Sequence, residues 1–188
     1  MTPASARRIV VHADESCLGN GRPGENPGGA GGLIEIVRAT GVSRRDYFIA
    51  EPDTTNNRMA IRSAMEALTH LGVGSKRLTL EFYSDSEYLV KGMSTWIRGW
   101  KRRDWKNVKN PELWQALDAL ATGHDITWRW VRGHNEHAKN EYANYLATRA
   151  ALEQRSSNGL TVSGFLDWLE LEKTRGLYKD YDPDHLPD

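Results

Sequence analysis

The 188-residue sequence contains one cysteine, three phenylalanines and no net formal charge, and it has no long apolar run. Because Cys17 has no second cysteine to pair with, an intramolecular disulfide is excluded, and a reducing cytoplasm is the simplest compartment. No segment approaches the ~20 apolar residues that cross a bilayer. The N-terminal residues also lack the apolar core, of roughly 7–15 residues, of a secretory signal. We therefore expect a cytoplasmic protein without membrane contact.

Charge is unevenly distributed along the chain, although 25 Lys and Arg residues balance 25 Asp and Glu residues. The neutral sum argues against a protein that coats nucleic acid in general. Residues 91–109, KGMSTWIRGWKRRDWKNVK, hold seven basic residues against one Asp, whereas residues 165–188 hold seven acidic residues against three basic ones. The sequence therefore predicts a basic patch suited to an anionic partner, and an acidic tail.

The pattern of apolar residues predicts an α/β protein. The expected strands are residues 8–14, 33–37, 46–50, 78–85 and 126–131, and the expected helices are residues 54–71, 86–98, 111–121 and 137–154. Glycine and proline crowd residues 19–32, which predicts a loop or a tight hairpin connection. This order of elements predicts a five-stranded mixed sheet, antiparallel in its first three strands and flanked by helices. We expect one domain over residues 1–154 and an acidic, aromatic-containing extension over residues 155–188, which begins with the linker RSSNG.

Two aspartates mark the most informative positions of this pattern. Asp14 and Asp85 each follow an apolar strand, at the edge of the sheet where α/β proteins place their functional sites. Strands often end in polar residues, so the placement alone leaves an ordinary surface role open. Paired carboxylates at such an edge would nevertheless suit a divalent cation.

Four sequence blocks together resemble type 1 ribonuclease H over about residues 9–151. They are ADESCLGN…NPGGAGG, TTNNRM, YSDSEYLVKGMSTWIRGWKRRDWKNVKNPELW and WRWVRGHNEHAKNEYANYLA, in the order of that family and with nearly its spacing. The resemblance implies a ribonuclease H-like fold that binds RNA/DNA hybrid and cuts its RNA strand. It also implies two Mg²⁺ ions, with Mn²⁺ as a substitute, held by four carboxylates.

The resemblance also shows where this sequence departs from the family's metal ligands. Asp14 and Asp85 match the first and third carboxylates, whereas the second position is Ala60 and the fourth is Asn144. With half of the anionic ligands missing, two ions would lack about two compensating charges, so weak or single-ion binding and impaired or lost cleavage are expected. Glu141, on the same helical face as Asn144, is the best substitute by spacing.

Each of these positions also has an alternative interpretation. Asn144 could ligate through its amide oxygen, and a solvated residue on the helix surface is the more ordinary interpretation of Glu141. Glu15 adjoins Asp14, but strand alternation points its side chain to the opposite side, which counts against it.

The remaining expectations concern substrate contacts. The resemblance assigns phosphate and sugar contacts to Asn20, Thr55, Asn56, Asn57 and Asn110, and a catalytic role to His134 in a loop. Helix capping by Thr54 or Thr55 is the alternative for that segment. The basic segment resembles the family's protrusion for the DNA strand, with Trp96, Trp100, Lys101, Arg102, Arg103 and Lys106 as binding residues. Core packing is the alternative for the two tryptophans.

Several functional hypotheses remain open from the sequence. The first is a hybrid-binding protein with little or no cleavage, and the second is an active ribonuclease H with substitute ligands. An active enzyme that was disabled by substitution at Ala60 and Asn144, or a structural module, are further alternatives. The extension could pack back on the domain, bind an unidentified protein partner or cover the basic segment. We expect a monomer.

Overall fold

The computed structural model describes residues 7–19, 24–72, 74, 77–133 and 137–186, and it shows a mixed sheet between helices. The strands are β1 (Arg8–Cys17), β2 (Gly28–Arg38), β3 (Gly41–Glu51), β4 (Thr79–Ser84), β5 (Asp125–Trp130) and β6 (Thr161–Val162). Their order across the sheet is β5-β4-β1-β2-β3-β6. β1, β2 and β3 form an antiparallel meander, while β4 and β5 run parallel to β1. The expected mixed α/β fold is therefore confirmed.

The sheet has six strands, so the prediction of five was wrong by one edge strand. Thr161 and Val162 pair with Asp46 and Arg45 on the free edge of β3. Two residues are too few to show the period-2 pattern that identifies a strand in a sequence. The preceding loop already lies along β3, because the Ser157 backbone N–H donates to the Phe48 carbonyl.

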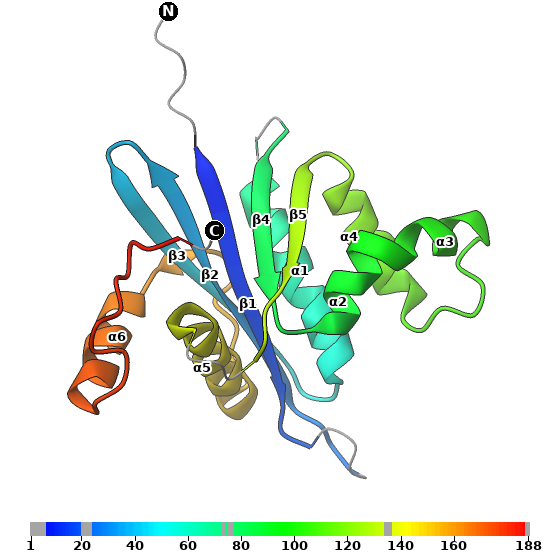
Figure 1. Cartoon of the computed structure of the whole chain (residues 1–188). Coiled ribbons are helices and arrows are strands. Elements are labelled where there is room, and N and C mark those ends of the chain that lie inside the picture. Colours follow the sequence, from blue (N-terminus) through cyan, green and yellow to red (C-terminus); the bar gives the residue numbers. More distant parts are fainter. Residues whose placement is uncertain (1–6, 20–23, 73, 75–76, 134–136, 187–188) are drawn as a thin grey trace, which may run out of the picture.

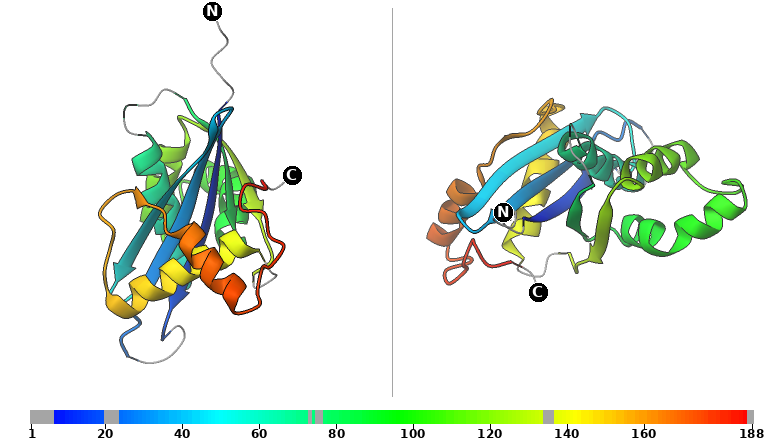
Figure 2. Two further views of the ribbon diagram at one scale, coloured as in Figure 1. Left: turned by 90° about the vertical axis from the view of Figure 1, so that its left-hand side faces the viewer. Right: turned by 90° about the horizontal axis from the view of Figure 1, so that it is seen from above.

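The helices lie on both faces of the sheet (Figure 1). They are α1 (Asn56–Gly72), α2 (Glu87–Lys91), the π-helical turn η1 (Gly92–Trp96), α3 (Ile97–Arg102), α4 (Pro111–Ala121), α5 (Ala138–Glu153) and α6 (Phe165–Thr174). α1 and α4 cover one face, with Ile61, Leu68 and Trp114 buried against the sheet. α5 covers the other face, and α6 packs beside it (Figure 2). No described helix is long and apolar enough to cross a membrane.

The glycine-rich residues 28–32 belong to β2, which corrects the expectation of a loop throughout residues 19–32. A side chain at Gly29 or Gly31 would overlap the backbone of α5 around Ala147. A side chain at Gly32 would instead overlap the ring of Tyr47 on the other face. These glycines therefore allow close packing on both faces of the strand, a role that composition alone does not distinguish from a turn.

The described part of the extension packs back on the domain. Phe165 and Leu169 of α6 are buried with Leu33 of β2 and Tyr142 of α5. Figures 1 and 2 place α6 and the basic helix α3 at opposite ends of the molecule. Of the three alternatives for the extension, the structure thus shows packing on the domain and not coverage of the basic segment.

The predicted helix over residues 86–98 is longer and less regular in the structure. It starts at the Ser86 cap, whose hydroxyl accepts a hydrogen bond from Leu89 N at 3.3 Å, and it continues through η1 to Arg102. Gly92 opens the π-helical turn, and a side chain there would overlap the fully buried indole of Trp114. The turn therefore lets the helix pass closely over α4.

We predict that Gly92→Ala destabilises the protein by about 1–3 kcal/mol, because neither the helix backbone nor the buried indole can move freely. Urea unfolding would measure the free-energy change. Gly99→Ala is the matched control, because no atom lies within 4 Å of the added methyl group. The control should be neutral or stabilising by up to ~1 kcal/mol, through helix propensity. Equal effects of the two substitutions would contradict this account of Gly92.

Candidate active site

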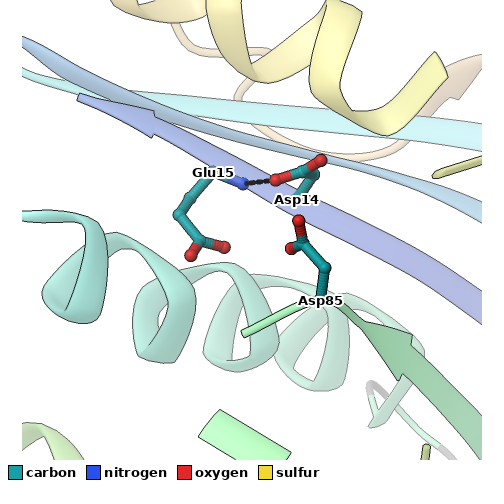
Figure 3. A group of neighbouring side chains, drawn as sticks. All are labelled: Asp14, Glu15 and Asp85. Atoms are coloured by element: carbon teal, nitrogen blue, oxygen red, sulfur yellow. Dashed lines mark hydrogen bonds between the residues drawn. The ribbon is translucent and has the colours of Figure 1, made fainter. Parts of the chain in front are cut away.

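Three carboxylates meet at one end of the central strands. Asp14 and Glu15 lie near the end of β1, and Asp85 follows β4 directly. β1 and β4 are parallel neighbours, with Ala13 opposite Ser84, so the next residues of both strands emerge at the same edge. One oxygen from each of the three carboxylates lies within 4.8 Å of the others (Figure 3). The structure thus brings together both predicted aspartates and adds Glu15.

Glu15 was discounted in the sequence because adjacent strand residues alternate between faces. The alternation does hold: β1 stays regular, with Glu15 paired to Ala30, and Figure 3 shows Glu15 directed toward α1. Asp85, however, lies beyond the end of β4, and its carboxylate is near both the Asp14 and the Glu15 side chains although these point to opposite faces. At this edge the longer glutamate side chain reaches the group from the other face. The expected direction of the Glu15 side chain is therefore confirmed, and its carboxylate nevertheless lies beside those of the two aspartates.

Ala60 lies on the same side of the sheet as Glu15. Ala60 is 1% exposed and belongs to one buried cluster with Ala13, which shares its strand face with Glu15. The resemblance expects a carboxylate from α1 here, but α1 offers only a methyl group. Glu15 of β1 instead supplies a carboxylate to this side of the group.

The electrostatics of the group favour a cation. Burial, followed by the charge of Asp85, raises the pKa of Asp14 to about 8. Burial, followed by the charge of Asp14, raises the pKa of Glu15 well above its ordinary value. The Glu15 backbone N–H donates to Asp14 Oδ1 at 2.7 Å and opposes only part of this effect. Three carboxylate oxygens in such proximity form the hard donor set that Mg²⁺ and Mn²⁺ prefer, so the residues fit such an ion.

The helix α5 supplies an amide to this group. Asn140 is 4% exposed, and its Nδ2 donates to Asp14 Oδ2 at 3.3 Å. Asn144 lies one helical turn later, where its Oδ1 accepts a weak hydrogen bond of 3.4 Å from Thr148 Oγ1. The sequence analysis did not identify Asn140 as a site residue, although it lies four residues before Asn144 and so on the same face of the helix.

Glu141, the substitute ligand favoured by spacing, does not join the three-carboxylate group within the described residues. Its charge does contribute to the raised pKa of Asp14. Glu141 therefore lies close enough to act on Asp14 through space, but the structure brings Glu15 into the group instead.

The end of β5 and the residue after it hold the backbone at Ser84 and Asp85. Trp130 Nε1 donates to the Asp85 carbonyl at 3.0 Å, and Val131 N donates to the Ser84 carbonyl at 3.0 Å. A methyl group on Gly133 would lie 2.6 Å from Asp85 Oδ2. The absence of a side chain at Gly133 thus allows the chain to pass against the carboxylate. The predicted catalytic His134 and the predicted contact Asn20 lie outside the described residues.

The TTNN segment begins α1 beside the start of α4. Thr55 Oγ1 accepts a hydrogen bond from Arg58 N at 3.3 Å, which confirms that Thr55 caps the helix. Arg58 Nη1 donates to Asn110 Oδ1 at 3.1 Å and so links the two helix starts. The Oδ1 atom of Asn56 is buried without a hydrogen-bond partner among the described residues, while Asn57 is exposed. The segment therefore combines helix capping with one buried amide oxygen that has no partner among the described residues.

The basic helix divides its residues between packing and exposure. Trp100 packs between the rings of Trp96, Trp105 and Trp114, at centroid distances of 5.0–6.4 Å. Its contacts are therefore those of a packed residue, which was the alternative to nucleic-acid binding. Trp96 is 39% exposed. Lys101 donates to Asp118 at 2.7 Å. The exposed cations of residues 97–109 that form no ion pair within the described residues are Arg98, Arg102, Arg103, Lys106 and Lys109.

Comparison with known proteins decides the family. The family model described as RNase H matches residues 6–152. The chain belongs to the ribonuclease H family. Ribonuclease H of Cupriavidus necator is 43% identical over 148 residues, which are 76% of this chain and 94% of that protein. Ribonuclease H of a Janthinobacterium species is 46% identical over 147 residues, again 76% of this chain and 94% of the relative.

Solved ribonuclease H structures agree with this fold. LC9-RNase H1, described as "a type 1 RNase H with the type 2 active-site motif", superposes with a TM-score of 0.86 and 47% identity. The match covers 93% of this chain and 86% of that one. The RNase H domain of PFV superposes with a TM-score of 0.65 at 18% identity, which shows the shared fold alone; it covers 78% of this chain and 96% of that one. The family model includes the three carboxylates and nearly all of α5 but not the extension, whereas the match to LC9-RNase H1 reaches into the extension.

We predict that the metal-free protein loses stability as the pH rises from about 4 to about 8. The folded-state pKa of Asp14 lies above its unfolded value, so ionisation in this range costs folding free energy. Asp85→Asn should reduce this loss and raise the thermal midpoint at pH 8 in EDTA. Asp104→Asn, in an exposed loop, is the control. The account fails if Asp85→Asn and the natural protein show the same pH dependence.

We also predict that Gly133→Ala weakens Mg²⁺ binding by about 10- to 100-fold, because the methyl group displaces the Asp85 carboxylate. Titration calorimetry measures the affinity directly. Gly123→Ala provides the matched control, because an added methyl group there meets no atom within 4 Å. Unchanged Mg²⁺ affinity in Gly133→Ala would show that Asp85 tolerates displacement.

Proposed function

We propose that this protein is an active ribonuclease H, which hydrolyses the RNA strand of RNA/DNA hybrids with divalent ions held by Asp14, Glu15 and Asp85. The observation that carries the proposal is the third carboxylate, Glu15, beside the two aspartates. The match to the ribonuclease H family supports the reaction class. The unusual motif in the description of LC9-RNase H1 agrees with a rearranged ligand set in a similar protein.

Charge balance favours retained activity over loss. Two carboxylates would leave two divalent ions about two charges short, whereas three leave them about one charge short, and the substrate phosphate supplies further anionic oxygens. When bound, such ions activate water and stabilise the leaving oxygen. Asp14, Glu15 and Asp85 supply the oxygen donors. Asn140 fixes the orientation of the Asp14 carboxylate through its Nδ2 hydrogen bond.

Substrate recognition is proposed for the polar start of α1 and for the basic helix. The unpartnered Asn56 Oδ1 can accept a hydrogen bond from a sugar hydroxyl, while the Thr55 hydroxyl and the Asn57 amide N–H groups can donate to phosphates. Arg102, Arg103 and Lys106 are exposed and free of described ion pairs, so they suit the second backbone of the duplex. Trp96 offers an exposed ring beside these cations.

A hybrid-binding protein that does not cleave is the second candidate. Ala60 and Asn144 favour it, because both lack the charge that the resemblance expects at those positions. The two candidates differ only in the chemistry at the carboxylate group, so binding and cleavage must be measured on the same samples.

We predict that the natural protein cleaves a labelled RNA/DNA hybrid in Mg²⁺, and that Glu15→Gln lowers the cleavage rate at least about 100-fold while hybrid binding persists. Loss of a direct ligand should exceed the ~10- to 100-fold effect typical of outer residues around a metal. Glu87→Gln is the matched control, because Glu87 is an exposed glutamate that forms a surface pair with Lys91.

A second variant tests whether the position of the charge matters more than the residue that carries it. In the Glu15→Gln background, Ala60→Glu restores a carboxylate from α1 on the same side of the sheet and should recover part of the activity. Binding without cleavage by the natural protein, in both Mg²⁺ and Mn²⁺, would instead establish the second candidate. Full activity of Glu15→Gln would exclude Glu15 as a ligand and direct attention to Glu141.

A further inference from the structure

One buried carboxylate joins β2, β3 and the start of α5. Glu35 of β2 is 0% exposed. Its Oε1 accepts from Arg44 Nε of β3 at 2.9 Å, and its Oε2 accepts from Lys139 Nζ of α5 at 2.7 Å. The side chain of Arg44 is 10% exposed and that of Lys139 only 3%. Two largely buried cations thus share one fully buried carboxylate, which leaves an excess of positive charge.

The end of the chain supplies the missing partners. We call residues 177–186 the C-terminal strap; it runs from α6 back to the sheet (red in Figure 1). Arg44 Nη2 donates to the Pro183 carbonyl and to Asp184 Oδ1, both at 2.7 Å, and Lys139 Nζ donates to the His185 carbonyl at 2.8 Å. The strap therefore adds one carboxylate and two carbonyl oxygens to the two cations.

The strap is also connected to the carboxylate group through residues of α5. Lys139 immediately precedes Asn140, whose Nδ2 contacts Asp14. A cavity of about 150 Å³ lies beneath the strap; Tyr181 and His185 line it from the strap, and Asn140 lines it from α5. A path of three residues, His185, Lys139 and Asn140, thus connects the end of the chain to Asp14.

The first turn of α5 depends on this anchoring because its own cap is weak. His137 precedes the helix but makes no side-chain capping hydrogen bond. Lys139, in the first turn, is instead held from two sides, by Glu35 and by the strap. An unanchored first turn would allow Asn140 to shift against Asp14.

We propose that the C-terminal strap is a positioning element for the metal site, and that it fixes Asn140 against Asp14 by holding Lys139 and Arg44. The proposal rests on the proposed ribonuclease H function. It gives the extension, which lies outside the family match, a role in the chemistry at the carboxylate group. Lys139 and Arg44 act here as positioning residues, because neither contacts the reacting atoms.

The test uses the full chain with the strap released. Arg44→Lys/Asp184→Asn keeps a cation for Glu35 but removes the forked contact to the strap. Arg149→Lys/Glu153→Gln is the matched control, because it makes the same kind of change in an exposed pair at the far end of α5. Tyr181→Ala is an independent release variant that removes no charged side chain.

The readouts separate positioning from simple stabilisation. Backbone relaxation by NMR reports whether the strap is released, and the Asn140 side-chain amide signal reports its contact with Asp14. Calorimetry reports Mg²⁺ affinity, and hybrid cleavage gives kcat and KM. We expect release to shift the Asn140 signal, to weaken Mg²⁺ binding about tenfold and to lower kcat, with an unchanged KM for hybrid. The control should change none of these.

If the strap is released but Mg²⁺ affinity and the Asn140 signal are unchanged, the proposal is overturned. The strap would then only cover the residues beneath it. If the double variant fails to fold, Tyr181→Ala decides between the same two outcomes. Absence of cleavage by the natural protein would count against the proposed function alone. The Asn140 signal and Mg²⁺ affinity would still test the strap in that case.

Discussion

The mutual repulsion of the Asp14, Glu15 and Asp85 carboxylates is the constraint that the surrounding structure must offset. Parallel pairing of β1 and β4 brings the three carboxylates to one edge of the sheet, where burial and like charge raise the pKa of Asp14 to about 8. Such a group is costly without a cation. A hydrogen bond from Asn140 orients the Asp14 carboxylate, and the absence of a side chain at Gly133 leaves space for the Asp85 carboxylate. The Glu35 network and the strap then fix the start of the helix that carries Asn140.

The position of negative charge matters here more than the element that carries it. A cation responds to oxygen atoms at suitable distances, irrespective of where their side chains begin. Glu15 approaches the group from the face of the sheet that α1 covers, which is where Ala60 leaves a methyl group in the buried core. The absent carboxylate of α1 and the additional carboxylate of β1 thus compensate each other. In the proposed function, the polar start of α1 serves substrate recognition, and β1 rather than α1 supplies the carboxylate on this side of the sheet.

The sequence was sufficient where a property depends on neighbouring residues. Strand positions, the Thr55 cap and the meeting of Asp14 with Asp85 follow from periodicity, capping and strand order. It was insufficient where a property depends on distant packing. Gly29 and Gly31 resembled a turn because the approach of α5 is not visible locally, and the two residues of β6 are too few for a pattern. Alternation correctly predicted the direction of Glu15 but not its reach, and the pairing of Arg44 with Asp184 spans 140 residues.

The most direct test of the central claim is the structure of the protein with Mn²⁺ and an RNA/DNA hybrid, with the ion located by its anomalous scattering. The account predicts that a Glu15 oxygen coordinates an ion together with Asp14 or Asp85, at a distance of about 2.0–2.2 Å, as expected for a small hard cation. An ion bound by Asp14 and Asp85 with Glu141 or Asn144 as the third ligand, and with Glu15 turned away, would contradict it.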